Sequence, residues 1–389
     1  MMKKEKIGFA GLQLLAYITF SLCMSNFIPY MAQMGYSSLE RSYALSAYAV
    51  LTILLQLFFG FLSNAFQTSK WISLVSLFLL GFFASLLFGL NQDSLVLVVL
   101  LVGFCGGLVN SLCSLIDTWI MGVNLTMAEN LSRLKVFGSI GWTLGSLSST
   151  LLINYFGFKG ITLAVLTFTL GILSFSRRLP DSCHQRRKDP ETVSAVNLIK
   201  NKPYLFLVFI LFLLYGLVVA NTGIVVDKML ALEASQFEIS LKWAMGSLLE
   251  IPMYFYSMKL IHKYGNQHLL LLSSAIFVLQ FLGFSLAQGS LYIVLFSSLQ
   301  ALTTPIILIT SKFLIAELVP VNLQSSSQMI AMSIYMGGSS LLTPLISGYL
   351  GSWLGFNLTL ALYAFLALVI FISLYLWIQF KPRLQENDC

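Results

Sequence analysis

Long, nearly uninterrupted apolar runs fill most of this chain, and short polar breaks separate them. A helix of about 20 apolar residues crosses the hydrocarbon core of a bilayer, which is about 30 Å thick. Runs of that length therefore predict membrane-spanning helices. We count twelve of them, near residues 7–31, 42–66, 71–90, 94–122, 133–155, 159–176, 204–226, 240–262, 267–288, 291–312, 325–350 and 356–380.

These runs are typical of helices rather than of a β-barrel. They lack the short alternating segments of an outer-membrane barrel. A helix also satisfies its backbone polar groups within its own span. The run at 7–31 lacks a small-residue cleavage site, so we expect it to be retained as the first helix. The predicted fold class is an all-α membrane protein.

Composition supports the same class. Hydrophobic residues make up 58% of the chain, charged residues only 10%, and the mean hydropathy is +0.86. A soluble globular domain carries about 25% charged residues. The chain is therefore expected to be a polytopic protein whose main partner is the lipid bilayer.

One long polar stretch, residues 177–202, divides the twelve runs into six and six. It contains Pro180, Pro190 and five basic residues. Two six-helix halves joined by a central loop are the layout expected of two repeated bundles around a transport path. We therefore expect an N-terminal bundle over 1–176, a cytoplasmic basic linker over 177–202 and a C-terminal bundle over 203–389.

The distribution of basic residues predicts the orientation. With the N-terminus inside, 18 of the 22 Lys and Arg residues lie on the cytoplasmic side, and only Arg41, Lys159, Lys228 and Lys242 lie outside. Cytoplasmic loops of membrane proteins carry such an excess. Both termini are then cytoplasmic, in a multi-pass protein of the inner or plasma membrane. The net charge of +7 faces the anionic leaflet and needs no nucleic acid partner.

Ionisable residues inside the runs are the candidates for function. Asp117 lies within the fourth run, Glu250 lies within the eighth, and Arg133 and Lys135 open the fifth. A charge in hydrocarbon costs a few kcal/mol or more, so such residues normally face protein or water and serve a function. These four residues are our first candidate site residues.

Several segments in the first half resemble a known family. The loop after the second run resembles the conserved loop of the major facilitator superfamily, because it keeps Gly60 and Lys70, although Asn64 replaces its aspartate. Residues 56–63, Asn110 placed seven residues before Asp117, and residues 133–142 resemble the lactose, nucleoside and phenylpropionate permease group. The resemblance implies two six-helix bundles that alternate access to a central site.

The resemblance also implies roles for individual residues. Asp117 and Lys135 would hold substrate hydroxyls, and Trp142 would stack on a sugar ring. The sugar symporter has arginine where this chain has Lys135, and that exchange removes a planar two-pronged donor. Its charged coupling residues fall here on Gln280, Gln300 and Thr303. If protons are moved, another carboxyl group must carry them.

Glu250 is the expected proton carrier. It stands in a Glu-x-Pro sequence with Pro252 that resembles the phenylpropionate permeases, and its neighbours Leu248, Leu249 and Ile251 are apolar. Desolvation by such neighbours favours a neutral carboxyl group. The alternative is a structural carboxylate bonded where Pro252 frees a helix carbonyl. Asp117 is a second candidate for proton coupling.

The other candidates also have structural alternatives. Asp117 could form a permanent ion pair with Arg133 or Lys135 that fastens two helices. Arg133 could be an ordinary cytoplasmic charge. Trp142 could be packing, although it shares a helix face with Lys135 seven residues earlier. Gly138, Gly141 and Gly145 predict close helix packing through small residues.

Neutral polar side chains are scattered over six of the runs. Alone, each is more often an interhelical hydrogen bond than a ligand. Together they predict a polar cavity with little charge in its C-terminal half. The residues are Asn26, Gln56, Asn110, Asn221, Gln280 and Gln300.

The predicted function is secondary transport of a small polar organic solute such as a sugar or nucleoside, with protons in symport. Two alternatives stay open: proton-driven efflux of amphipathic compounds, and an uncoupled facilitator or sensor of the same fold. The sequence lacks a phosphate-binding loop and the common hydrolase motifs, so neither an enzyme nor an ATP-driven pump is expected. We expect no cofactor and no metal, and a monomer.

Overall fold

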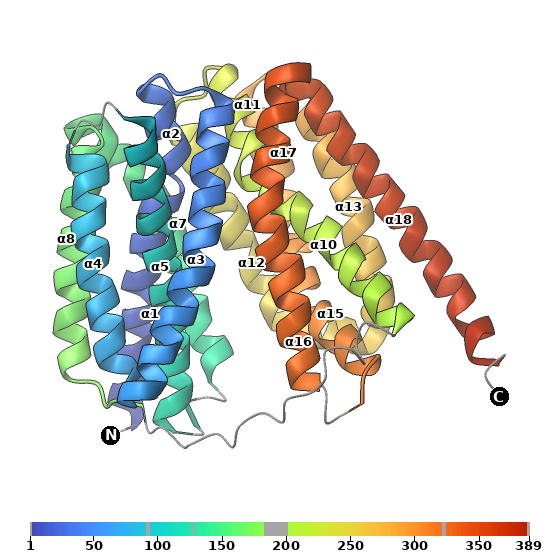
Figure 1. The fold of residues 1–389 in the computed structure, drawn as a ribbon, viewed down its shortest axis with the longest axis horizontal. Helices are drawn as coiled ribbons and strands as arrows, with labels where there is room; N and C mark the ends of the chain where they lie inside the picture. The colour runs from blue at the N-terminus through green and yellow to red at the C-terminus, as the bar shows by residue number, and fades with distance from the viewer. Residues whose placement is uncertain are drawn as a thin grey trace. The chain divides into compact units, whose positions relative to one another are not determined.

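The computed structural model describes residues 2–90, 94–124, 126–127, 130–182, 201–320 and 324–386. These residues form helices and connecting turns, and no strand occurs among them (Figure 1). Eleven helical segments in this part of the chain are long and apolar enough to cross a membrane. The fold class expected from the sequence, all-α with many spans, is confirmed at this level.

The first half of the chain provides six of these spans. Its helices are α1 (Met2–Met24), α2 (Phe27–Gln33), α3 (Ser38–Phe66), α4 (Ser69–Gly89), α5 (Leu95–Val123), α7 (Leu131–Phe156) and α8 (Lys159–Arg177).

The second half is more interrupted. Its segments are α10 (Lys202–Thr222), α11 (Ile224–Ala231), α12 (Gln236–Tyr264), α13 (Asn266–Leu286), α14 (Ser290–Ser297), η1 (Ser298–Leu302), α15 (Thr304–Glu317), α16 (Gln324–Met332), η3 (Ser333–Gly338), α17 (Ser339–Leu354) and α18 (Phe356–Glu386).

The expected run at 240–262 corresponds to α12, which is not among the eleven segments. This helix has 29 residues, so it is long enough to span. It carries Lys242, Glu250 and Lys259 along with Pro252, and these residues lower its hydropathy. The count of twelve spans therefore stays a prediction.

Four expected spans are not continuous α-helices. The first is broken between α1 and α2 at Ser25 and Asn26, and the seventh between α10 and α11 at Gly223. The tenth contains the 3₁₀ segment η1, and the eleventh contains the π-helical segment η3. Such irregular turns are frequent at functional sites, and transporters use broken helices around their ligands.

The chain forms two compact units. One consists of Met1–Arg186 with Glu233–Leu248, and the other of Arg187–Leu232 with Leu249–Cys389. The first part of α12 thus packs with the first unit, and its second part packs with the second. The expected basic linker over 177–202 lies largely outside the described residues, which resume at Asn201.

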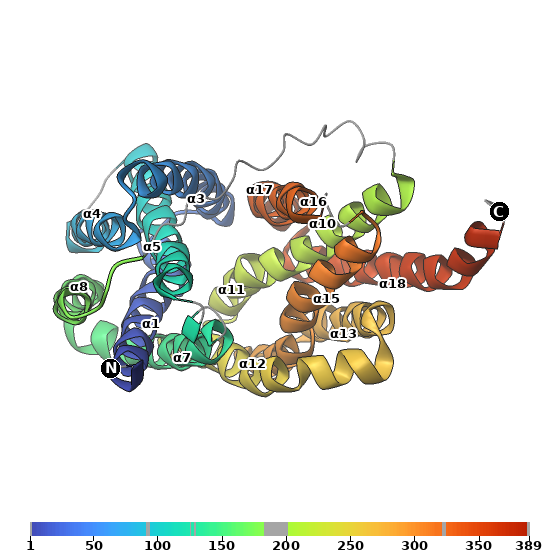
Figure 2. The ribbon, with the colours of Figure 1, turned by 90° about the horizontal axis from the view of Figure 1, so that it is seen from below.

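In the first unit, α1 lies among α5, α7 and α8 (Figure 2). The contact with α7 is very close. A Cβ atom at Gly141 would lie 2.4 Å from the carbonyl oxygen of Leu14, and one at Gly145 would lie 2.6 Å from that of Ile18. The prediction that small residues allow close packing is confirmed at these two positions.

Matching N-terminal caps begin α3 and α12. Ser37 and Glu40 form a capping box, in which the serine hydroxyl accepts from the Glu40 N–H and the glutamate accepts from the Ser37 N–H. Ser235 and Glu238 make the same two bonds before α12. Each cap satisfies N–H groups that have no partner within the helix. The same cap therefore begins one helix in each half of the sequence.

The turn before α4 is fastened by the segment that follows α8. The Asp181 carboxylate accepts from the Thr68 hydroxyl at 2.5 Å and from the Lys70 N–H at 3.1 Å. The Lys70 ammonium donates to the Leu179 carbonyl at 2.8 Å. The Trp119 ring N–H on α5 donates to the Pro180 carbonyl at 2.8 Å. An acidic residue therefore does contact this loop, although Asn64 replaces the one expected within it.

In the second unit, α13 packs against α15 and α18, and α10 packs against α15 and α17. The π-helical segment η3 also lies against α10. Next to it, the hydroxyl of Ser339, the first residue of α17, donates to the Phe212 carbonyl of α10 at 2.6 Å. This unit contains Glu250 and the interrupted tenth helix.

Candidate functional site

Asp117 on α5 is the centre of a polar cluster in the first unit. Its carboxylate forms an ion pair with the Lys135 ammonium of α7, with 2.7 Å between Oδ2 and Nζ. Its other oxygen accepts a 2.8 Å hydrogen bond from the Gln13 side chain of α1. Three helices therefore meet at one carboxylate. Sequence analysis gave an ion pair of Asp117 with Arg133 or Lys135 as the alternative to a substrate role, and it did not single out Gln13.

The two members of this ion pair differ in exposure. The Asp117 side chain is 17% exposed, and that of Lys135 is 48% exposed. Arg133, at the start of the same helix, is exposed. It makes no ion pair among the described residues, so Lys135 rather than Arg133 is the partner of Asp117.

A second polar chain links α3 to α5. The Gln56 side chain donates to the side-chain oxygen Oδ1 of Asn110 at 3.2 Å, and the Asn110 side-chain Nδ2 donates to the Tyr48 hydroxyl at 2.8 Å. Gln56 and Asn110 were expected to be site residues, and the structure brings them together. Tyr48 was missed because its spacing in the run is that of an ordinary packing residue.

Trp142 lies in an aromatic cluster. Its ring is 5.0 Å from that of Phe20 on α1 and 6.1 Å from that of Trp243 on α12, measured between centroids. The ring planes of Phe20 and Trp243 are inclined to that of Trp142 by 73° and 59°. The Lys242 ammonium lies 3.8 Å from the centroid of Trp243. The sequence predicted Trp142 as a stacking residue but gave no signal for Trp243.

The break in the first span also joins α12. The Asn26 amide donates to the Leu22 carbonyl at 2.8 Å, which satisfies part of the broken turn. Its oxygen accepts from the Gln236 side chain at 2.9 Å. Asn26 is fully buried, so the structure supports an interhelical bond at this position.

Glu250 lies at one end of a hydrogen-bonded chain in the second unit. Its Oε1 accepts a 2.8 Å hydrogen bond from the Gln300 amide, and the Gln300 oxygen accepts from the Asn221 amide at 2.9 Å. Three of the expected site residues therefore form one chain. In the described part of the chain no cation is in an ion pair with Glu250, in contrast to Asp117.

The interrupted helices position these three hydrogen-bonded side chains. Gln300 is the middle residue of η1 (Ser298–Leu302), which is followed by Thr303, Thr304 and Pro305, where the proline N–H is missing and the α-helix restarts. Asn221 lies two residues before Gly223, which ends α10. Glu250 lies on α12 two residues before Pro252. Each polar side chain thus comes from a turn where the regular helix is disturbed.

Gln280 is buried apart from these contacts. Its side chain is fully buried on α13, and neither amide atom has a hydrogen-bond partner among the described residues. A buried amide without partners is costly unless water or a ligand satisfies it. Its role as a site residue stays a prediction.

The groups in these clusters are suited to hydrogen bonding and ring stacking. Amides, hydroxyls and one ion pair can hold solute hydroxyl groups, aromatic rings can cover a planar face, and Glu250 can exchange a proton. No group of three or more His, Cys, Asp or Glu side chains that could hold a metal occurs in the part of the chain that the structure describes.

Comparisons with known proteins agree with the fold. The family model described as "MFS_1 like family" matches residues 9–374. No curated protein matches the sequence.

Solved structures of membrane transporters are similar over nearly the whole chain. A mutant of the nucleoside transporter NupG has a TM-score of 0.82 and 14% identity, covering 95% of this chain and 98% of its own. The unmutated NupG structure has a TM-score of 0.80 at 14% identity, covering 96% and 98%. The POT family transporter PepTSo has a TM-score of 0.73 at 10% identity, covering 96% and 97%.

Proposed function

This chain belongs to the MFS_1-like family, and from that premise we propose that it is a secondary transporter that carries a small polar organic solute together with protons. A nucleoside or a sugar is the solute class that the polar clusters fit best. The solute would gain access alternately from the two sides of the membrane as the two bundles rock.

The observation that carries this proposal is the contrast between the two intramembrane carboxyl groups. Asp117 is paired with the Lys135 ammonium, whereas Glu250 is bonded only to the neutral Gln300 amide among the described residues. A carboxyl group without a cation partner in a membrane span is suited to gain and lose a proton during a cycle. Glu250 is therefore assigned to proton coupling and Asp117 to the solute.

Two groups of residues in the first unit support this solute class. A carboxylate and an ammonium offer charge-assisted hydrogen bonds to hydroxyl groups, and Gln13 adds an amide to the same cluster. The edges and faces of Trp142 and Trp243 suit a planar or apolar ring face. A solute with both features, such as a nucleoside, matches these groups. NupG, a nucleoside transporter, shares this fold, so nucleosides are the first solutes to test.

The experiment is proton uptake into proteoliposomes that contain the full chain. Nucleosides, sugars and aromatic acids are added in turn to wild type, Glu250→Gln and the control Glu317→Gln. Glu317 is an exposed carboxylate of the same unit, bonded to Asn266. We expect one solute class to drive proton entry in wild type and in the control but not in Glu250→Gln, which should still exchange labelled solute across the membrane.

Other outcomes have definite meanings. Solute flux without proton movement in wild type would support the uncoupled facilitator. Unchanged coupling in Glu250→Gln would refute its assignment and leave Asp117 as the candidate. Proton exit on addition of amphipathic compounds would support efflux.

A further inference from the structure

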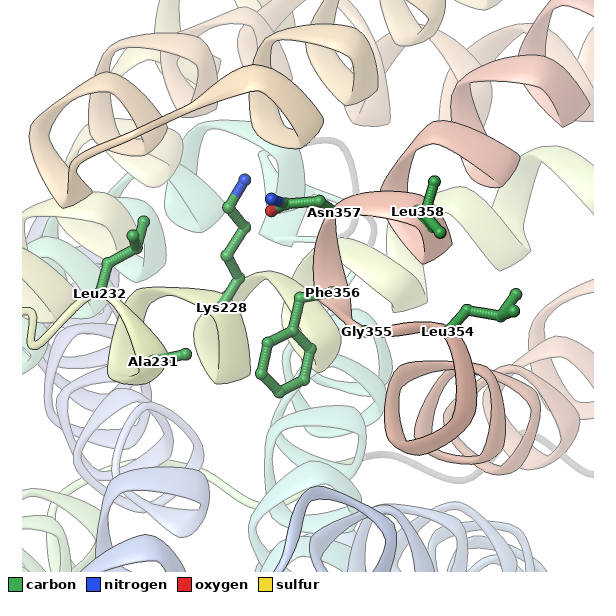
Figure 3. A pocket seen from close by; sticks show the side chains of 8 residues that line it. All are labelled: Lys228, Ala231, Leu232, Leu354, Gly355, Phe356, Asn357 and Leu358. Carbon is green, nitrogen blue, oxygen red and sulfur yellow. The ribbon is translucent and has the colours of Figure 1, made fainter.

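A cavity of about 340 Å³ lies at one end of the second unit, away from Glu250 in the sequence and in its contacts. The end of α11, the end of α17 and the start of α18 form its walls (Figure 3). Most of its lining is apolar, including Leu232, Leu354 and Phe356, and its polar side chains are Lys228 and Asn357. The cavity therefore combines one positive charge with apolar walls.

The Lys228 ammonium is the unusual group in this cavity. The side chain is only 2% exposed. Its Nζ donates to the carbonyls of Phe284 and Ser285 at the end of α13, at 2.5 and 2.9 Å. Both partners are neutral, so these contacts leave its charge uncompensated, and an ammonium has a third N–H to donate. Buried charges in proteins are usually paired with a charge of opposite sign, which a bound anion would supply here.

The start of α18 adds donors on the same side. Gly355 has φ +79° and ends α17, and α18 begins at Phe356. The first N–H groups of a helix have no partner within it and attract anions. Figure 3 shows the Asn357 amide directed toward the end of the Lys228 side chain, and both line the cavity. An anion placed there would meet a full charge, an amide and the helix start.

Exposed aromatic residues place this end of the unit at a membrane–water interface. Tyr349 and Trp353, in the last two turns of α17, are 61% and 73% exposed. Tyr292, near the start of α14, is 59% exposed. Tyrosine and tryptophan concentrate at the level of the lipid headgroups. Under the expected topology, this is the outer leaflet.

We propose that this cavity binds the phosphodiester headgroup of a membrane phospholipid, with the Lys228 ammonium against the phosphate and the glycerol and upper acyl chain along Leu232, Leu354 and Phe356. An anionic lipid such as phosphatidylglycerol suits the single cation. The site does not depend on the transported solute or on proton coupling.

The test is lipid binding by the purified, delipidated full chain in micelles, measured by native mass spectrometry. The probes are short-chain phosphatidylglycerol, the diacylglycerol with the same chains but no phosphate, and inorganic phosphate. We expect one retained phosphatidylglycerol, with little retention of diacylglycerol and weak binding of inorganic phosphate. Lys228→Gln should weaken lipid binding about tenfold, the loss expected for a charge-assisted hydrogen bond.

Two further variants keep the result independent of folding. Leu358→Trp places a larger side chain at an exposed position of the cavity lining and leaves Lys228 in place, so it should also lose the lipid. Lys159→Gln removes an exposed lysine at the start of α8 and should bind as wild type does. Equal binding by Lys228→Gln and wild type, equal binding of diacylglycerol, or inorganic phosphate that competes as tightly as the lipid would each overturn the proposal.

Discussion

Gln300 donates a hydrogen bond of 2.8 Å to the carboxyl group of Glu250 while its own oxygen accepts from Asn221 at 2.9 Å. The two bonds use the nitrogen and the oxygen of one amide, so each fixes the orientation required by the other. Only one oxygen of Glu250 is engaged in this contact, which leaves Oε2 to take a proton. The three residues therefore act as one unit in the proposed cycle.

Replacing Gln300 by leucine should disturb this unit without removing the carboxyl group. A buried polar group left without its partner costs about 1–3 kcal/mol, so we expect Gln300→Leu to lower kcat/KM for solute uptake about tenfold or more. Initial uptake rates in proteoliposomes measure the effect. Gln328→Leu is the control, because that side chain only donates to the Lys312 carbonyl. Uptake at the wild-type rate in Gln300→Leu would show that the hydrogen bonds joining Asn221, Gln300 and Glu250 have no part in transport.

The ion pair of Asp117 and Lys135 allows its two explanations to be separated. If the pair only fastens α5 to α7, the double variant Asp117→Asn/Lys135→Met should recover whatever stability and transport the single variants lose. If Asp117 holds the solute, the double variant should recover stability but not transport. We expect the second result. Because Lys135 is about half exposed, the stability change should be on the order of 1 kcal/mol or less, read from the melting temperature in detergent.

Much of the fold follows from the sequence because membrane spans depend on local composition. The runs near 71–90 and 159–176 match the segments Ser69–Gly89 and Lys159–Arg177 within two residues. The partnership of Asp117 with a basic residue was also predictable, since a charge at that depth requires compensation.

The rest depends on contacts between residues distant in the sequence. Gln13 is one polar residue in an apolar helix, and only the packing of α1 against α5 shows that it bonds to Asp117. Trp142 and Trp243 are far apart in the sequence, yet their rings are in contact. No periodicity in the sequence reveals such a contact. The break at Ser25 and Asn26 has a local signal in Pro29, which lacks an N–H and crowds the Ser25 carbonyl four residues earlier. The bond between Asn26 and Gln236, in contrast, shows only in the packing.

Trp243 is expected to contact the solute through its ring N–H. That nitrogen is buried and has no hydrogen-bond partner among the described residues. Trp243→Phe keeps an aromatic ring but removes the donor, so it should leave stability equal or slightly higher, since an unsatisfied group is lost. Solute affinity should fall by up to about tenfold.

Tryptophan fluorescence quenching and uptake kinetics measure this effect. Trp119→Phe is the control: its N–H is already bonded to the Pro180 carbonyl, so its loss should lower stability and leave affinity unchanged. Equal solute affinity in Trp243→Phe and wild type would exclude the ring N–H as a donor to the solute.

Asp181 should make stability depend on pH in acid. Burial opposes its charge, but hydrogen bonds from the Thr68 hydroxyl and from the Lys70 and Ser182 N–H groups outweigh this and lower the pKa of Asp181 below its ordinary value. The ionised carboxylate therefore adds stability above the pKa of the unfolded chain, about 4. That contribution is lost as the pH falls through the lower pKa of the folded state.

At pH 7, the free energy of unfolding of Asp181→Asn should thus be lower than that of wild type by on the order of 1 kcal/mol, because the site is partly exposed. Its melting temperature should be lower accordingly. The difference should shrink below about pH 4. Thr68→Val is the companion variant: it keeps the carboxylate but removes one donor, so the pKa of Asp181 should move back toward its ordinary value. This account would be refuted if the difference in stability between Asp181→Asn and wild type stayed constant from about pH 3 to about pH 7, a range around the ordinary pKa.

Gly141 and Gly60 offer a matched test of helix packing in the first unit. A Cβ atom at Gly141 would lie 2.4 Å from the Leu14 carbonyl oxygen, which is backbone and cannot turn aside, whereas a Cβ atom at Gly60 would have nothing within 4 Å. Gly141→Ala must therefore push α1 away from α7, and overpacking of this kind costs about 1–3 kcal/mol. Gly60→Ala should be neutral or stabilising by about 0.5–1 kcal/mol, because alanine favours the helix.

Melting temperatures of the two variants in the same detergent give the comparison. Since α7 also carries Lys135 and Trp142, Gly141→Ala should lower solute affinity as well, and a fully active, equally stable Gly141→Ala protein would mean that the close approach of these helices is not required.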